Sequence, residues 1–261
     1  MLVRRFLPGV SAGIARPASV GVVFRAVALV PSPPLLVPEL TGRGAPEASE
    51  VRAASLDAAR FLAAAADVWV AVGVDESSGR IASTSSGTFA GYGVDVAVAL
   101  SPRARAVDPE LPLPALIAGW LRGQAAPDSS VDVRLVEQAA ESDECRRLGR
   151  ELREEMDSDG REWGLLVVGD GATTLTEKAP GSFDARAADV QARIDDALAT
   201  ADLETLARLD RRLCHDVGAR SVAAWQTLTG VVGADRIRPR TLYRGAPFGV
   251  GYFVGTWDVL R

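Results

Sequence analysis

Short apolar runs separated by helical stretches constrain the fold of this chain more than any other feature of its sequence. The four clearest runs span 22–30, 68–74, 131–136 and 163–168. Most of their residues are aliphatic or β-branched, and the runs at 68–74 and 163–168 contain no charged residue, which is typical of strands covered on both faces by helices. Helical patterns at 46–66 and 143–156 lie between them. This alternation predicts an α/β fold, with a single domain whose mostly parallel central sheet is flanked by helices.

The same patterns predict the remaining elements. We expect further strands at 94–100 and 249–257, a long loop at 77–93, and helices at 113–121, 184–200, 203–217 and 221–232. Asp202 is a candidate N-cap for the helix that follows it. Four aromatic side chains of the last apolar segment are expected in the core or in an oligomer interface: Phe248, Tyr252, Phe253 and Trp257.

Composition and charge exclude several classes of function. The chain has 48% hydrophobic and 24% charged residues and a formal net charge of -5. Phosphate contacts need clustered Lys and Arg, so we expect no nucleic-acid partner. No run of about eighteen apolar residues occurs, so we expect no membrane span. Cys145 and Cys214 have neither zinc spacing nor a disulfide framework, which is typical of reduced, packed thiols in a cytoplasmic protein.

The first 22 residues differ from the rest. They contain several arginines, no acidic residue and the interrupting residues Pro8, Gly9 and Gly13. A targeting peptide would be less broken and would end in a cleavage signal. We therefore expect residues 1–22 to be a disordered or mis-assigned extension and residues 23–261 to form the domain.

Polar residues follow three of the predicted strands. Ser32 lies in a proline-rich loop after the first strand, Asp75 and Glu76 follow the second, and Asp170 stands in Gly169-Asp170-Gly171 after the strand at 163–168. The carboxyl ends of parallel strands share one sheet edge, where ligands bind in open α/β sheets. The three carboxylates are candidates for a Mg²⁺, Mn²⁺ or Ca²⁺ site, although solvated loop carboxylates are favoured.

No helix begins at the Gly-Asp-Gly segment, which argues against a phosphate-binding loop. The favoured interpretation is a turn that needs positive φ at glycine. In that turn, Asp170 braces neighbouring loops.

Four segments carry a resemblance to a known family. They are PSPPLLVPE at 31–39, GDGATTLTEKAPGSFDARA at 169–187, Trp225 and APFGVGYF at 246–253. In order and spacing they resemble the LigB-like family, the B subunits of class III extradiol ring-cleavage dioxygenases, over roughly residues 23–257. The resemblance implies the LigB-like dioxygenase fold. It also implies a non-haem Fe(II) held by two histidines and a glutamate, a further histidine as acid/base, and an aromatic diol as substrate.

The family's functional residues are absent from the matching positions. Ser32 stands at the first metal histidine, and Val74 or Asp75 stands near the second. Thr173 stands at the acid/base histidine, and Ser221 at the metal glutamate. The only histidine, His215, lies outside these segments. Serine and threonine hydroxyls are poor ligands for Fe(II), so we expect no bound iron cofactor.

Lys178 and Asp184 lie within the resembling stretch, where we favour an ion pair between them over a role at a pocket rim. We predict a non-catalytic or re-purposed homologue whose ligand-binding residues are Ser32, Asp75, Lys178 and Ser221, with Thr173 and Asp170 at the former catalytic position. It would bind a small aromatic ligand or a partner subunit, or form a homo-oligomer. The alternative is an active enzyme, either a dioxygenase completed by a partner subunit or a hydrolase that uses a hard cation.

Overall fold

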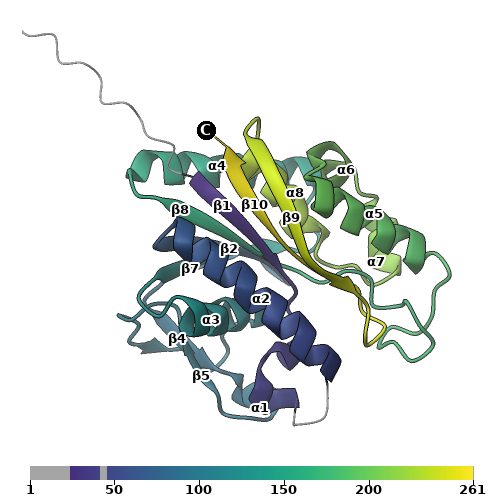
Figure 1. Cartoon of the computed structure of the whole chain (residues 1–261), viewed down its shortest axis with the longest axis horizontal. Coiled ribbons are helices and arrows are strands. Elements are labelled where there is room, and N and C mark those ends of the chain that lie inside the picture. The colour runs from purple at the N-terminus through teal and green to yellow at the C-terminus, as the bar shows by residue number, and fades with distance from the viewer. Residues whose placement is uncertain (1–23, 42–45, 261) are drawn as a thin grey trace, which may run out of the picture.

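The computed structural model describes residues 24–41 and 46–260, and the expectation for residues 1–22 lies outside them. The central sheet has seven strands in the order β3-β7-β2-β8-β1-β10-β9 (Figure 1). Four neighbouring strands are parallel: β1 (Phe24–Val30), β2 (Val68–Asp75), β7 (Ser130–Glu137) and β8 (Trp163–Val168). These are the four apolar runs of the sequence, so the parallel core was predictable from hydrophobic pattern.

The complete sheet is mixed rather than mostly parallel. At one edge β3 (Gly79–Ile81) runs antiparallel to β7. At the other, β10 (Tyr252–Leu260) runs antiparallel to β1, and β9 (Arg236–Gly245) runs antiparallel to β10. The sequence patterns did not predict β9, because its alternating arginines resemble a solvated surface. Pro239 in this strand lacks a backbone donor, which an edge strand tolerates.

The prediction of a long loop at 77–93 is wrong, because this segment contains short strands and a 3-10 helix. Besides β3, it holds β4 (Ser85–Thr88) and the 3-10 helix η3 (Phe89–Tyr92). β4 pairs with β5 (Ala97–Ala99) and β6 (Ala106–Val107) in a small second sheet. Ser, Thr and Gly are typical of loops, and β4 has no apolar run that would predict a strand. Of the strand expected at 94–100, only β5 forms.

Helices cover both faces of the large sheet (Figure 1). α2 (Pro46–Ala65) and α3 (Leu113–Ala125) pack on one face, where η1 (Pro34–Leu36) and α1 (Pro38–Thr41) also lie. The other face carries α4 (Ser142–Asp159), α5 (Ala187–Thr200), α6 (Leu203–Ala207), α7 (Arg211–Asp216) and α8 (Val222–Val232). The helix expected at 203–217 is therefore two helices.

Aspartate caps explain that break. The Asp202 side chain accepts a hydrogen bond from the Thr205 N–H at 2.9 Å. This contact confirms Asp202 as the N-cap of α6. The Asp210 side chain accepts one from the Leu213 N–H at 3.0 Å and so begins a second helix, α7. A capping residue has non-helical backbone angles, so α6 ends before Asp210.

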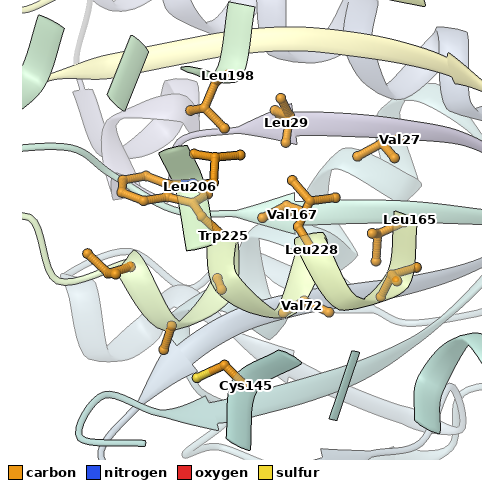
Figure 2. Packing of buried hydrophobic residues seen from close by; sticks show 14 of the residues in the cluster. Val27, Leu29, Val72, Cys145, Leu165, Val167, Leu198, Leu206, Trp225 and Leu228 are labelled. Atoms are coloured by element: carbon orange, nitrogen blue, oxygen red, sulfur yellow. The ribbon is translucent and has the colours of Figure 1, made fainter. Parts of the chain in front are cut away.

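Alternate residues of the strands supply two apolar cores. Val27 and Leu29 of β1 face the α8 side, whereas Ala26 and Ala28 face the α2 side. Figure 2 shows the first of these cores, with Trp225 of α8 beside the strands. This alternation follows from the two-residue period of a strand.

Most other predictions for buried residues are confirmed. Cys145 and Cys214 are buried and free, as predicted. Tyr252, Phe253 and Trp257 of β10 are buried in the core, whereas Phe248 is exposed because it lies in the loop before that strand. Among the described residues, no helix is both long enough and apolar enough to cross a membrane.

Candidate functional site

Ser32, Asp170 and Ser221 meet at the carboxyl edge of the sheet. Val30 of β1 pairs with Val168 of β8, so Ser32 and Asp170 both follow their strands by two residues. The Ser32 N–H donates to Oδ1 of Asp170 at 2.8 Å, and the Ser32 hydroxyl donates to Oδ2. The N–H of Asp170 in turn donates to the Ser221 hydroxyl oxygen at 2.9 Å. We call these three residues the Ser–Asp–Ser cluster.

The glycines beside Asp170 are required by close packing. A Cβ on Gly169 would lie 2.6 Å from Cβ of Ser221, and one on Gly171 would lie 2.0 Å from Oε1 of Gln191. Neither glycine has positive φ, so the predicted positive-φ turn is wrong. Small size at these positions lets α8 and α5 approach the loop that follows β8.

The environment of Asp170 favours its neutral form. Burial raises the pKa of Asp170, and the two hydrogen bonds from Ser32 oppose that rise. Burial also raises the pKa of Tyr252 on the neighbouring β10, with a further contribution from the charge of Asp170. A carboxyl that retains its proton more tightly is a weaker ligand for a cation, because metal binding requires the carboxylate. Its two hydrogen bonds from Ser32 join the loop after β1 to the loop after β8.

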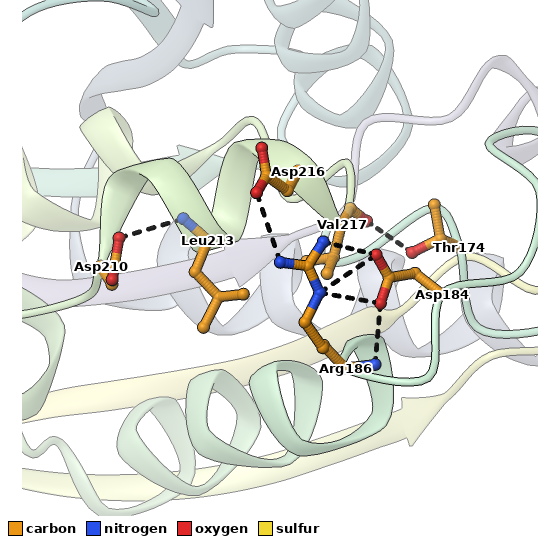
Figure 3. Close-up of polar contacts among 7 residues, drawn as sticks. All are labelled: Thr174, Asp184, Arg186, Asp210, Leu213, Asp216 and Val217. Carbon is orange, nitrogen blue, oxygen red and sulfur yellow. Dashed lines mark hydrogen bonds and ion pairs between the residues drawn. The ribbon is translucent and has the colours of Figure 1, made fainter.

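Thr173 is held in the loop between β8 and α5. Its N–H donates to the Val217 carbonyl at 3.0 Å, and its own carbonyl accepts from the Gly181 N–H at 3.0 Å. Gly218, with φ of +78°, leaves no room for a Cβ, which would lie 1.9 Å from the Thr173 hydroxyl oxygen. The next residue, Thr174, donates its hydroxyl to the same Val217 carbonyl at 3.0 Å (Figure 3). Thr173 is thus packed against the connection from α7 to α8.

Asp75 ends β2 and lies outside the Ser–Asp–Ser cluster. Its backbone carbonyl accepts from the Gln138 N–H at 3.0 Å. Its charge adds to the effect of burial in raising the pKa of Tyr92. Within the described residues, no three His, Cys, Asp or Glu side chains form a group that could hold a metal. Asp75, Glu76 and Asp170 therefore do not converge there as a cation site.

The expected ion pair between Lys178 and Asp184 does not form. Asp184 pairs instead with Arg186, two residues along, at 2.7 Å (Figure 3). Hydrogen bonds from Arg186 lower the pKa of Asp184 to about 2. Asp184 pairs with Arg186 because Arg186 lies two residues away, at the N-cap of α5, whereas Lys178 is exposed in the preceding loop.

A pocket of about 470 Å³ opens at the carboxyl ends of β2 and β7, near the start of α8. Its lining includes Arg220 and Val222, the two sequence neighbours of Ser221, and Glu76, the neighbour of Asp75. The rest of the lining comes from the end of β7, from α7 and from the residue after Gly218: Glu137, Gln138, Ala139, Arg211, Arg212, His215 and Ala219. We name it the arginine pocket. The sequence patterns did not predict this pocket. The only local signal for it is the grouping of Arg211, His215 and Arg220 in and just after one short helix.

The residues at this edge do not fit the Fe(II) centre that the resemblance implies. That centre needs two imidazoles and a carboxylate. Here Ser32, Asp170 and Ser221 satisfy one another by hydrogen bonds. His215 is exposed in the last turn of α7, in a pocket whose three arginines outnumber its two glutamates, and the excess positive charge opposes a cation.

Comparison with known proteins gives a fold and no activity. No family model matches the chain, and no curated protein matches it. Among solved structures, the chain is similar to the uncharacterized protein JW3007 from Escherichia coli K12, with a TM-score of 0.50 and 13% sequence identity. The match covers 90% of this chain and 99% of that one. The likeness spans nearly the whole α/β domain, so the two proteins share their general architecture.

Proposed function

We propose that this chain is a LigB-like homologue that has lost the iron ligands and serves as a small-molecule-binding protein. The Ser–Asp–Ser cluster carries the proposal. Ser32 and Ser221 stand where the resemblance requires metal ligands. The Ser32 hydroxyl instead donates to the Asp170 carboxylate, and the Ser221 hydroxyl accepts from the Asp170 N–H. The ligand is a small aromatic molecule bound at the carboxyl edge, and a homo-oligomer or partner subunit is compatible with this role.

The arginine pocket supports the binding part of the proposal. It lies at the sheet edge where α/β proteins bind ligands, and its size is in the range of small-molecule sites. Its lining includes Arg220 and Val222, the sequence neighbours of Ser221, which is one of the positions that depart from the family pattern. Loss of metal ligands beside a retained pocket is the arrangement expected of a re-purposed binding protein.

Oxygen uptake tests the loss of ring cleavage. Protein incubated anaerobically with Fe(II) is mixed with catechol or protocatechuate in an oxygen electrode. We expect consumption no faster than with Fe(II) alone, and no ring-opened product in the absorbance spectrum. Sustained uptake with product formation would favour the active-enzyme alternative.

An Asp170→Asn variant is the matched control for that assay. It keeps the size of the side chain and removes its charge. If uptake were seen in the wild type and persisted in this variant, the activity would not depend on a carboxylate at this position. Oxygen consumption that stays at the Fe(II) blank in both proteins supports the proposal.

A further inference from the structure

The arginines of the arginine pocket have no carboxylate partners. In the described part of the chain, arginines elsewhere commonly pair, as Arg153 does with Asp235 at 2.5 Å and Arg244 with Asp195 at 2.8 Å. Within the same residues, Arg211, Arg212 and Arg220 form no ion pair, although Glu76 and Glu137 line the same pocket. Three arginines therefore line one concavity with only two glutamates, which leaves the pocket with an excess of positive charge. A bound anion would supply the missing charge.

Arg211 is already held in position. Its Nη2 donates to the Gln138 carbonyl at 2.7 Å, which fixes the side chain between α7 and the end of β7. Its Nη1 is buried and has no hydrogen-bond partner. A buried donor left unpaired costs about 1–3 kcal/mol, so such groups in native proteins call for an explanation. Because the buried Nη1 is closed to the pocket, Arg211 acts on a ligand through its fixed positive charge and not through a hydrogen bond from Nη1.

The start of α8 adds a second source of positive potential. Arg220 and Val222 bracket its N-cap, Ser221, at the pocket wall. The Ser221 hydroxyl makes no capping hydrogen bond and accepts instead from the N–H of Asp170. The first N–H groups of a helix have no partner within the helix and attract anions. The Ser–Asp–Ser cluster thus leaves the N-terminus of α8 uncapped beside three arginines.

We infer that the arginine pocket binds a small organic anion, with its carboxylate or phosphate group held by the exposed side chains of Arg212 and Arg220 and attracted by the charge of Arg211. The small apolar side chains of Ala219 and Val222 contact the organic part of the ligand. This inference rests on the proposed function only in taking the chain to bind a small molecule. It is independent of the fate of the iron site.

Calorimetric titration with phenyl phosphate, benzoate, inorganic phosphate and neutral benzamide tests the inference. We expect phenyl phosphate or benzoate to bind saturably at one site per chain, and the stronger of the two tells a phosphate site from a carboxylate site. Benzamide should bind at least about tenfold more weakly than that anion, because it offers the arginines no charge. Inorganic phosphate should also bind more weakly, because it lacks an apolar body.

Arginine variants locate the binding. Arg212→Gln and Arg220→Gln alter exposed side chains, so both should fold. Each should weaken binding of the preferred anion about tenfold, the usual effect of losing one charge-assisted hydrogen bond. Arg60→Gln, an exposed arginine of α2 on the opposite face, is the matched control and should leave binding unchanged.

Three results would overturn the inference: no saturable anion binding at millimolar concentration, equal binding of benzamide, or full affinity in both pocket variants. None of them bears on oxygen uptake. Ring cleavage together with arginine-dependent anion binding would instead refute the proposed function and leave the anion site standing.

Discussion

Replacement of Asp170 by alanine removes the acceptor that holds Ser32 at the sheet edge. The change deletes the partner of the Ser32 N–H, 2.8 Å from Oδ1, and that of the Ser32 hydroxyl. The hydroxyl can rotate toward water, whereas the backbone N–H cannot. An unpaired donor costs about 1–3 kcal/mol and a lost hydrogen bond about 1 kcal/mol. We therefore expect Asp170→Ala to lower the free energy of unfolding by about 2–4 kcal/mol in urea titrations at pH 7.

Asp170→Asn separates hydrogen bonding from charge in the same experiment. The amide oxygen can still accept from the Ser32 N–H, and the amide nitrogen can donate to the Ser32 hydroxyl oxygen. Burial raises the pKa of Asp170, so an uncharged group also avoids desolvation of the carboxylate. We expect a loss of less than about 1 kcal/mol. Equal losses in the two variants, or a greater loss in Asp170→Asn, would refute this account of the cluster.

Two further predictions concern the contacts of α5 behind the site. Burial raises the pKa of Asp195 to about 6, against the lowering effects of Arg244 and Gln191. The folded state therefore binds the proton of Asp195 more tightly than the unfolded state does. As the pH rises from about 4 to about 6, the free energy of unfolding should fall by up to about 3 kcal/mol. Urea titrations at several pH values should show a smaller change for Asp195→Asn. Gly171→Ala would place a Cβ 2.0 Å from Oε1 of Gln191, which accepts from the Ala172 N–H at 2.8 Å. Displacing that side chain should cost about 2–4 kcal/mol in urea titrations at pH 7, and wild-type stability would contradict the packing argument.

The parallel core and its carboxyl edge were predictable from local sequence, whereas the sheet edges were not. The run at 163–168 is apolar throughout and became β8 with the same bounds. β9 alternates arginines with partly buried residues because one of its faces meets solvent, and this pattern does not separate a strand from an exposed loop. Its pairing with β10 depends on a contact between chain segments, which propensity does not encode.

The site was predictable only to the level of the strand ends. Ser32 and Asp170 follow strands that the sequence identified, and adjacent parallel strands bring them together. Ser221 entered through the family resemblance, and its hydrogen bond to Asp170 joins residues 51 positions apart. The arginine pocket is assembled from the ends of β2 and β7 and from α7 and α8, so its shape depends on the packed fold. The sequence offers Asp184 two cationic partners, Lys178 and Arg186, and only the folded loop shows that Arg186 lies within reach.

Equilibrium binding of Fe(II) tests the central claim, that the Ser–Asp–Ser cluster has replaced the family's metal centre. Protein purified without chelator would be dialysed anaerobically against micromolar Fe(II), and the metal bound per chain measured by elemental analysis. We predict binding far below one Fe(II) per chain and no change in it with Asp170→Asn. One tightly bound Fe(II) per chain, lost in that variant, would contradict the account.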